Sequence, residues 1–157
     1  MRSRNSPSAG SCSGVGAAKV GKPFEYSLRV RFAECDPQGI VFNAHFLAYF
    51  DVSLTELWRA AFGSYQTMLD RGVDVVLAEA HLRYLSPARF DDELKLGISV
   101  SRLGTTSIHT RHHVWRGLEL LVEGTLRHVC VDNTTYQKEP IPGWTADGLV
   151  PWIVELD

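Results

Sequence analysis

The sequence has little cysteine and no long apolar run, and each absence excludes a class of protein. Its three cysteines, Cys12, Cys35 and Cys130, are odd in number and widely spaced, which fits neither a disulfide framework nor a zinc-binding pattern. No stretch approaches the roughly 18 consecutive apolar residues of a membrane-spanning helix. We therefore expect reduced thiols, a cytoplasmic location and no membrane association.

Strong charge of either sign is also missing. The net charge is −2 over 157 residues, so the chain as a whole has no electrostatic reason to bind nucleic acid. Hydrophobic residues make up 45% and charged residues 22%, which is an ordinary globular composition. This length predicts one domain with its own core.

The first 22 residues differ from the rest in composition. They are rich in Ser, Gly and Ala and lack the apolar block of a secretory signal. We expect residues 1–22 to form a flexible leader and residues 23–157 to form a single domain.

Hydrophobic periodicity predicts a strand followed by a long helix. Residues 24–32 alternate large apolar and polar side chains, the period of a half-buried strand. From Asn43 the apolar residues recur at three- and four-residue steps, which predicts a helix with one buried stripe. Asn43 is a candidate N-cap for this helix and Gly63 a candidate stop.

The remainder is predicted to be mostly strands. A short helical segment at residues 65–71 precedes strands at 73–84, 92–103, 105–116 and 118–133, the last two joined by a turn at Arg116-Gly117. The proline-rich tail should cover the surface with at most one short helix. The order predicts an α+β fold in which one antiparallel sheet wraps a hydrophobic helix, and an uncovered sheet edge that favours a dimer.

The densest group of polar residues lies between the first strand and the long helix. Pro37 biases Asp36 towards an extended conformation, and Gly39 permits a tight turn or a close approach to a ligand. The loop leads into a helix N-terminus, whose free N–H groups favour negative charge. A carboxylate facing such donors can perform acyl transfer, although this short string by itself favours a structural turn begun by Asp36.

Two longer strings resemble a known family. Residues 31–51 (RFAECDPQGIVFNAHFLAYFD) resemble the signature of the 4-hydroxybenzoyl-CoA thioesterase family of hot-dog proteins. Residues 83–94 (RYLSPARFDDEL) resemble a second hot-dog thioesterase motif between the second and third strands. Together they cover the spine of the domain, and the similarity is expected to extend over residues 24–140.

The resemblance implies a fold, an activity and a site. The fold is the hot-dog fold, and the activity is hydrolysis of an acyl-CoA without metal or cofactor. Asp36 matches the catalytic aspartate, acting as nucleophile through a mixed anhydride or as general base. The backbone N–H of Asn43 matches the oxyanion donor, and Gly39 matches the glycine beside the thioester. Many relatives have His-Ala-Asn where this chain has Asn43-Ala44-His45, so no role is assigned to either polar side chain.

Other carboxylates and histidines offer weaker alternatives. Glu34 is expected to face solvent or form an ion pair, and Asp51 and Glu56 on the helix are expected to be structural or to face another subunit. The four strand histidines, expected to be exposed and to hold no metal, are His109, His112, His113 and His128. Strand alternation puts His112 and His113 on opposite faces, so one strand cannot supply both to one ion. The cations that could each contact coenzyme A phosphates, but individually fit ordinary surface charge, are Arg83, Arg89, Lys95, Arg102 and Arg111.

The sequence thus predicts an acyl-CoA thioesterase, for which an aromatic substrate such as 4-hydroxybenzoyl-CoA is one candidate. An acyl carrier protein thioester is the nearest variant, and the chain is expected to form a homodimer or homotetramer. Two rivals stay open. One is a hot-dog enoyl hydratase or dehydratase that uses Asp36 with His45, and the other is a non-catalytic module that binds acyl thioesters.

Overall fold

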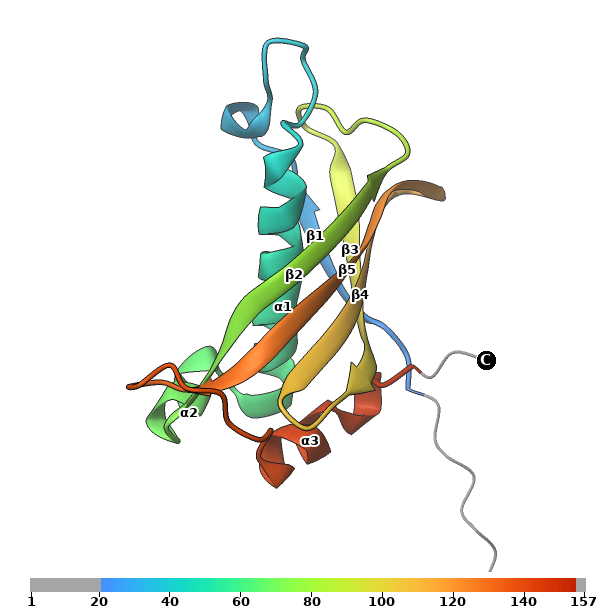
Figure 1. Cartoon of the computed structure of the whole chain (residues 1–157). Helices are drawn as coiled ribbons and strands as arrows, with labels where there is room; N and C mark the ends of the chain where they lie inside the picture. Colours follow the sequence, from blue (N-terminus) through green and yellow to red (C-terminus); the bar gives the residue numbers. More distant parts are fainter. Residues whose placement is uncertain (1–20, 155–157) are drawn as a thin grey trace, which may run out of the picture.

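One five-stranded antiparallel sheet packs against one long helix in the computed structural model, which describes residues 21–154 (Figure 1). The strand order is β1-β3-β4-β5-β2, so β1 and β2 form the two edges. In chain order the elements are β1 (Phe24–Arg29), the 3-10 helix η1 (Phe32–Glu34), α1 (Ala44–Phe62), α2 (Tyr65–Asp70), β2 (Val73–Tyr84), β3 (Glu93–Leu103), β4 (Ser107–Arg116), β5 (Glu119–Asp132), α3 (Gly143–Leu149) and η2 (Val150–Trp152).

The predicted helix and hairpin are confirmed, and the first strand is shorter than predicted. Helix α1 ends at Gly63, which has a φ of 84° and donates its N–H to Arg59. The turn between β4 and β5 contains Gly117 with a φ of 58°. The prediction of a strand over residues 24–32 was three residues too long, because the chain turns into η1 at Phe32, whose side chain is 79% exposed.

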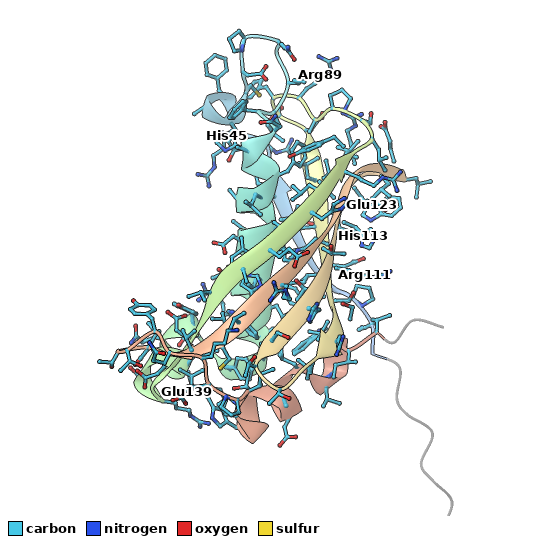
Figure 2. All side chains as sticks on the ribbon, in the orientation of Figure 1. His45, Arg89, Arg111, His113, Glu123 and Glu139 are labelled. Carbon is cyan, nitrogen blue, oxygen red and sulfur yellow. The ribbon has the colours of Figure 1, made fainter. Side chains whose placement is uncertain are left out.

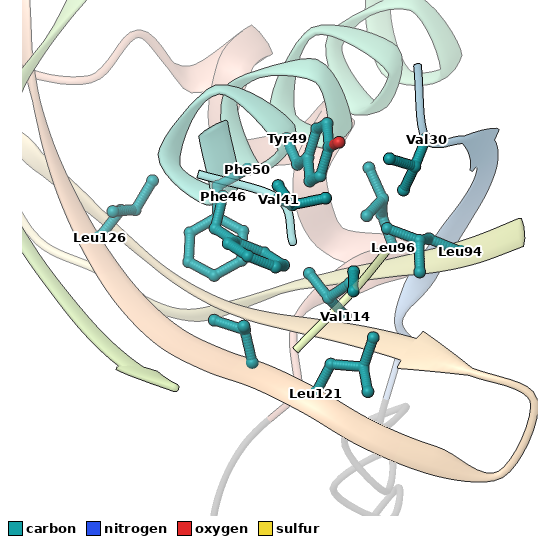
Figure 3. Close-up of a cluster of buried hydrophobic side chains, with 12 residues drawn as sticks. Val30, Val41, Phe46, Tyr49, Phe50, Leu94, Leu96, Val114, Leu121 and Leu126 are labelled. Carbon is teal, nitrogen blue, oxygen red and sulfur yellow. The ribbon is translucent and has the colours of Figure 1, made fainter. Parts of the chain in front are cut away.

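The core lies between α1 and the inner face of the sheet (Figure 3). The spacing of apolar residues in α1 places one stripe against the strands. Its buried members are Phe46, Tyr49, Phe50, Ser53, Leu54, Leu57 and Trp58. Burying each large side chain stabilises the fold by about 1.5–3 kcal/mol, so this single helix accounts for a large share of the hydrophobic stabilisation.

Gly124 on β5 lies where the sheet packs tightly against Phe50 of α1. A Cβ at this position would lie 2.6 Å from the carbonyl oxygen of His81 and 2.6 Å from Cε2 of Phe50. The neighbouring strand and the helix therefore leave no room for a side chain.

We expect Gly124→Ala to lower the free energy of unfolding by about 1–3 kcal/mol, because overpacking moves backbone that is fixed in the sheet. Chemical denaturation would measure the change. Gly97→Ala is the matched control, since the nearest atoms to a Cβ there lie 4.0 Å away on His113. Equal stability of the two variants would contradict the packing described here.

The first and last described residues lie beside each other, at the far end of the sheet from the η1 loop (Figure 1). Residues 1–20 of the predicted leader lie outside the described residues. Gly21 and Lys22 donate backbone hydrogen bonds to Ile153 and Pro151 at 2.8 and 3.3 Å. Within residues 21–154 no helix has the length and hydrophobicity needed to cross a membrane.

Candidate active site

The loop between η1 and α1 folds around Asp36. The backbone N–H of Asp36 donates to Ile40, and that of Gly39 donates back to the Asp36 carbonyl, both at 2.9 Å. Oδ1 of Asp36 accepts a hydrogen bond of 2.8 Å from the N–H of Gln38. Gly39 has a φ of 73°, which glycine adopts without strain. The turn fixes the carboxylate through one oxygen.

Helix α1 begins directly after this loop. Asn43 precedes its first residue, as predicted, but the Asn43 side chain forms no capping hydrogen bond. The N–H groups of a first helical turn have no acceptor within the helix, and they carry the positive end of the helix dipole. The N–H groups of His45 and Phe46 already donate to the carbonyls of Phe42 and Asn43 at 2.9 and 3.3 Å. Those of Asn43 and Ala44 donate to no backbone carbonyl of the described residues, so they are available to an oxygen that carries negative charge.

The last residue of β2 and the segment that follows it close the site from the other side. The Tyr84 hydroxyl donates to the Asn43 carbonyl at 3.0 Å, and the N–H of Val41 donates to the Ala88 carbonyl at 2.8 Å. The ring of Tyr84 also packs edge-on against Phe46, with centroids 5.8 Å apart. Together these contacts tie the Asp36 loop and the helix start to the segment 84–88.

A cleft of about 560 Å³ opens between these elements. Its walls combine the carboxylate, the helix start and several aromatic rings, and its lining residues are Asp36, Gln38, Ile40, Val41, Phe42, Asn43, Phe46, Tyr84, Leu85, Ser86 and Pro87. The structure thus brings Asp36 and Asn43 to one cleft. Gly39 does not line it, and its contribution is the turn that shapes the loop.

Tyr84 was part of the second motif but received no role from the sequence. Its hydrogen bond to Asn43 spans 41 residues of sequence, so local pattern could not reveal it. The available signal was the position of Tyr84 in the string RYLSP at the end of a predicted strand.

The alternative carboxylates lie elsewhere. Glu34 is half-buried and accepts hydrogen bonds of 2.8 Å from the Tyr49 hydroxyl and from the Arg31 N–H. Burial and this hydrogen bond raise the pKa of Tyr49 above its usual range. Glu56 pairs with Arg59 at 3.1 Å on the helix surface. Neither carboxylate lines the cleft that contains Asp36.

His45 lines a separate cavity of about 630 Å³ with Glu34 and Tyr49. Asp36 is not part of that cavity, so the two residues that a hydratase would need to pair face different spaces. Within residues 21–154 no group of three metal-binding side chains comes together.

The prediction that all four strand histidines are exposed was wrong, because His112 and His128 are buried and His109 and His113 are half-buried. His112 is 0% and His128 5% exposed. His112 shares the inward parity of Ile108 and Val114 on β4, and its ring stacks on Phe50 with centroids 4.5 Å apart. His113, on the opposite face as predicted, is half-buried.

Two hydroxyl groups satisfy the buried His112 ring. Ser53 Oγ lies 3.2 Å from Nδ1 and already donates to the Phe50 carbonyl, so it must accept from Nδ1–H. Thr110 Oγ1, 2.8 Å from Nε2, then donates to the unprotonated nitrogen. Burial lowers the pKa of His112 to about 3, so this imidazole is neutral and structural.

The family comparison covers most of the domain. Residues 30–149 match the model of the thioesterase-like superfamily. The acyl-CoA thioester hydrolase YbgC of Escherichia coli is 28% identical over 120 residues, which are 76% of this chain and 90% of that protein. A 1,4-dihydroxy-2-naphthoyl-CoA hydrolase of Acaryochloris marina is 25% identical over 142 residues, 82% of this chain and 93% of that one.

A solved structure agrees with the fold. The crystal structure of a hypothetical protein from Aquifex aeolicus superposes with a TM-score of 0.77 at 28% identity, covering 81% of this chain and 99% of that one. The family match is to the superfamily as a whole and does not single out the 4-hydroxybenzoyl-CoA thioesterases. The chain belongs to the thioesterase-like superfamily, which confirms the predicted hot-dog fold and the predicted enzyme class, a thioester hydrolase.

Proposed function

We propose that the chain hydrolyses an acyl-CoA thioester to the free acid and coenzyme A, with Asp36 as its catalytic carboxylate. The observation that carries this proposal is the meeting of Asp36 and the start of α1 in one cleft. The relatives named acyl-CoA thioester hydrolase and 1,4-dihydroxy-2-naphthoyl-CoA hydrolase support the substrate class.

The proposed reaction uses two groups, the backbone N–H of Asn43 and the carboxylate of Asp36. The thioester carbonyl oxygen points at the backbone N–H of Asn43, where the helix dipole stabilises the negative charge of the tetrahedral intermediate. Asp36 either attacks the carbonyl carbon, forming a mixed anhydride that water hydrolyses, or removes a proton from the attacking water. Coenzyme A leaves as the thiolate and takes up a proton.

Single turnover in water labelled with oxygen-18 distinguishes the two routes. If Asp36 attacks and water then cleaves the anhydride at the Asp36 carboxyl, the first product acid carries an unlabelled enzyme oxygen. If Asp36 acts as a base, the first product already carries the label. Mass spectrometry of the released acid reads out the difference.

The cleft lining favours an aromatic acyl group. Phe42, Phe46 and Tyr84 supply three rings to its wall, and aromatic side chains pack offset or edge-on against other rings. A panel of aromatic, short-chain and long-chain acyl-CoA thioesters with a free-thiol readout tests both activity and preference. Hydration of an enoyl-CoA without thioester cleavage would support the hydratase instead, and absence of all turnover would support the binding module. The same panel should include an acyl carrier protein thioester. The cytoplasmic location of the protein stays a prediction.

The proposed active form is a homodimer, the unit from which a tetramer would also be built. Strand β2 is an edge of the sheet, and it exposes Val76 by 37% and Leu77 by 44%. A free edge of this length exposes unpaired backbone groups that a second strand can satisfy. Because β2 ends at Tyr84 in the cleft wall, a partner strand paired along β2 would run beside the cleft and add to its wall.

We expect Leu77→Arg to convert the dimer to monomer and to lower turnover, since a charge would enter the apolar contact between two β2 strands. Light scattering after size exclusion measures the mass. Leu118→Arg is the matched control, because Leu118 is 99% exposed at the tip of the β4–β5 hairpin. A wild-type monomer with full activity would contradict the shared-cleft proposal.

A further inference from the structure

The face of the sheet opposite α1 carries rows of charged and histidine side chains (Figure 2). Strand pairing places Arg111 of β4 and His81 of β2 on either side of Thr125 of β5. The next row contains His113, Glu123 and Arg83 in the same strand order. These two rows surround a hollow of about 210 Å³.

The carboxylates on this face are already neutralised. Glu123 pairs with Arg83 at 2.7 Å, and Glu79 pairs with Arg127 at 3.1 Å. Arg111 forms no ion pair with any residue in the range 21–154, and it lines both the first hollow and a second one of about 340 Å³ that contains Arg102. The guanidinium of Arg111 therefore lies between two hollows without a counter-charge.

The excess of positive charge is confined to the surroundings of these two hollows. The whole chain has a net charge of −2, whereas the two hollows together are lined by four arginines (Arg83, Arg102, Arg111 and Arg127) and two glutamates (Glu79 and Glu123). Two copies of the face packed together would place like charges opposite each other, so self-association is disfavoured here. The complementary ligand is an anion.

The hollow offers the hydrogen-bond donors that a phosphoryl group requires. Arginine binds phosphate oxygens through a planar pair of N–H groups, and Thr125 adds a hydroxyl. The imidazoles of His81 and His113 add N–H donors from two strands. Burial lowers the pKa of His113, so its neutral ring donates through one nitrogen without adding charge.

We propose that this hollow binds a phosphate dianion, with Arg111 as its principal ligand and His81, His113 and Thr125 as further hydrogen-bond partners. The hollow shares no lining residue with the cleft around Asp36. It is therefore a second site, on the other face of the sheet from α1.

The test titrates the full-length protein with inorganic phosphate at constant ionic strength and follows the ring signals of the histidines by NMR. We expect saturable shifts of His81 and His113, and a loss of affinity of about tenfold or more in Arg111→Gln. Arg89→Gln is the matched control, because Arg89 lies in the loop at the far tip (Figure 2) and lines neither hollow. A circular dichroism spectrum and melting curve confirm that Arg111→Gln is folded.

Any of three results of the phosphate titration would overturn the proposal. They are shifts that do not saturate, shifts that sodium chloride reproduces, and unchanged phosphate affinity in Arg111→Gln. Saturable binding of polyglutamate without binding of phosphate would also overturn it, and would assign the face to an acidic protein.

A further experiment, with coenzyme A as the ligand, identifies the source of the phosphate. This experiment rests on the proposed function. If coenzyme A produces the same histidine shifts and Arg111→Gln raises KM with kcat unchanged, the phosphate belongs to the substrate's nucleotide. If phosphate binds while KM is unchanged, the ligand is a separate phosphorylated molecule. The phosphate titration needs no turnover, so its failure and failure of the thioesterase proposal are distinguishable.

Discussion

Asp36→Asn is expected to leave the fold intact and to reduce kcat by a factor on the order of 10² or more. The amide is nearly isosteric, and its oxygen can still accept the hydrogen bond that Gln38 donates to Oδ1. It lacks the anionic oxygen that either attacks the thioester or deprotonates water. Thioester cleavage followed by free-thiol release measures the loss.

Asp147→Asn is the matched control for this variant. Asp147 is exposed on α3, at the opposite end of the domain from the Asp36 loop (Figure 1), and its substitution should leave kcat unchanged. If Asp36→Asn retained activity within a few-fold of wild type, another carboxylate such as Glu34 or Glu56 would have to supply the chemistry.

Stability is expected to fall steeply in mild acid because of His112. The folded protein holds the pKa of this ring at about 3, whereas an unfolded histidine titrates near 6.5. The unfolded chain therefore binds a proton first, and the stabilisation present above pH 6.5 is lost as the pH falls towards 3. Each pH unit within this window costs about 1.4 kcal/mol of unfolding free energy for this single group.

Urea denaturation at a series of pH values measures this slope. His112→Gln should be less stable than wild type at pH 7.5, yet its stability should depend less on pH. His81→Gln, which changes an exposed histidine, should keep the wild-type dependence. Burial also lowers the pKa of His128, so part of the acid sensitivity should survive in His112→Gln. Identical pH profiles for wild type and His112→Gln would refute the role given to this ring.

Local sequence patterns predicted the helices and strands, but they did not predict contacts between segments that are far apart in sequence. The stripe on α1 and the hairpin at Gly117 follow from spacing along one segment, and both are confirmed. Strand alternation correctly placed His112 and His113 on opposite faces. It did not show that a neutral histidine can occupy the core, since that depends on Ser53, 59 residues away in sequence.

In the candidate site too, local patterns predicted some features, and others depend on contacts between distant segments. The motif at residues 31–51 identified Asp36 as a candidate. The change from strand to helix periodicity predicted that α1 starts at Asn43. The cleft that joins them depends on residues 84–88, whose contacts to the loop cross more than 40 residues of sequence. The partner of Tyr84 could therefore not be predicted from the sequence, and neither could the rows of charged side chains that β2, β4 and β5 build on the outer face.

The backbone hydrogen bond between Val41 and Ala88 and the pairing of β1 with β3 determine the order in which parts of the protein can fold during synthesis. During synthesis the Asp36 loop emerges early, but Ala88 follows Val41 by 47 residues, and the residues of β3 follow their partners on β1 by 64 to 74 residues. Contacts of such long sequence separation form slowly, because the chain must first close a large loop. The Asp36 loop thus acquires its shape only after the middle of the sheet exists, so a truncated nascent chain displays the carboxylate without a cleft around it.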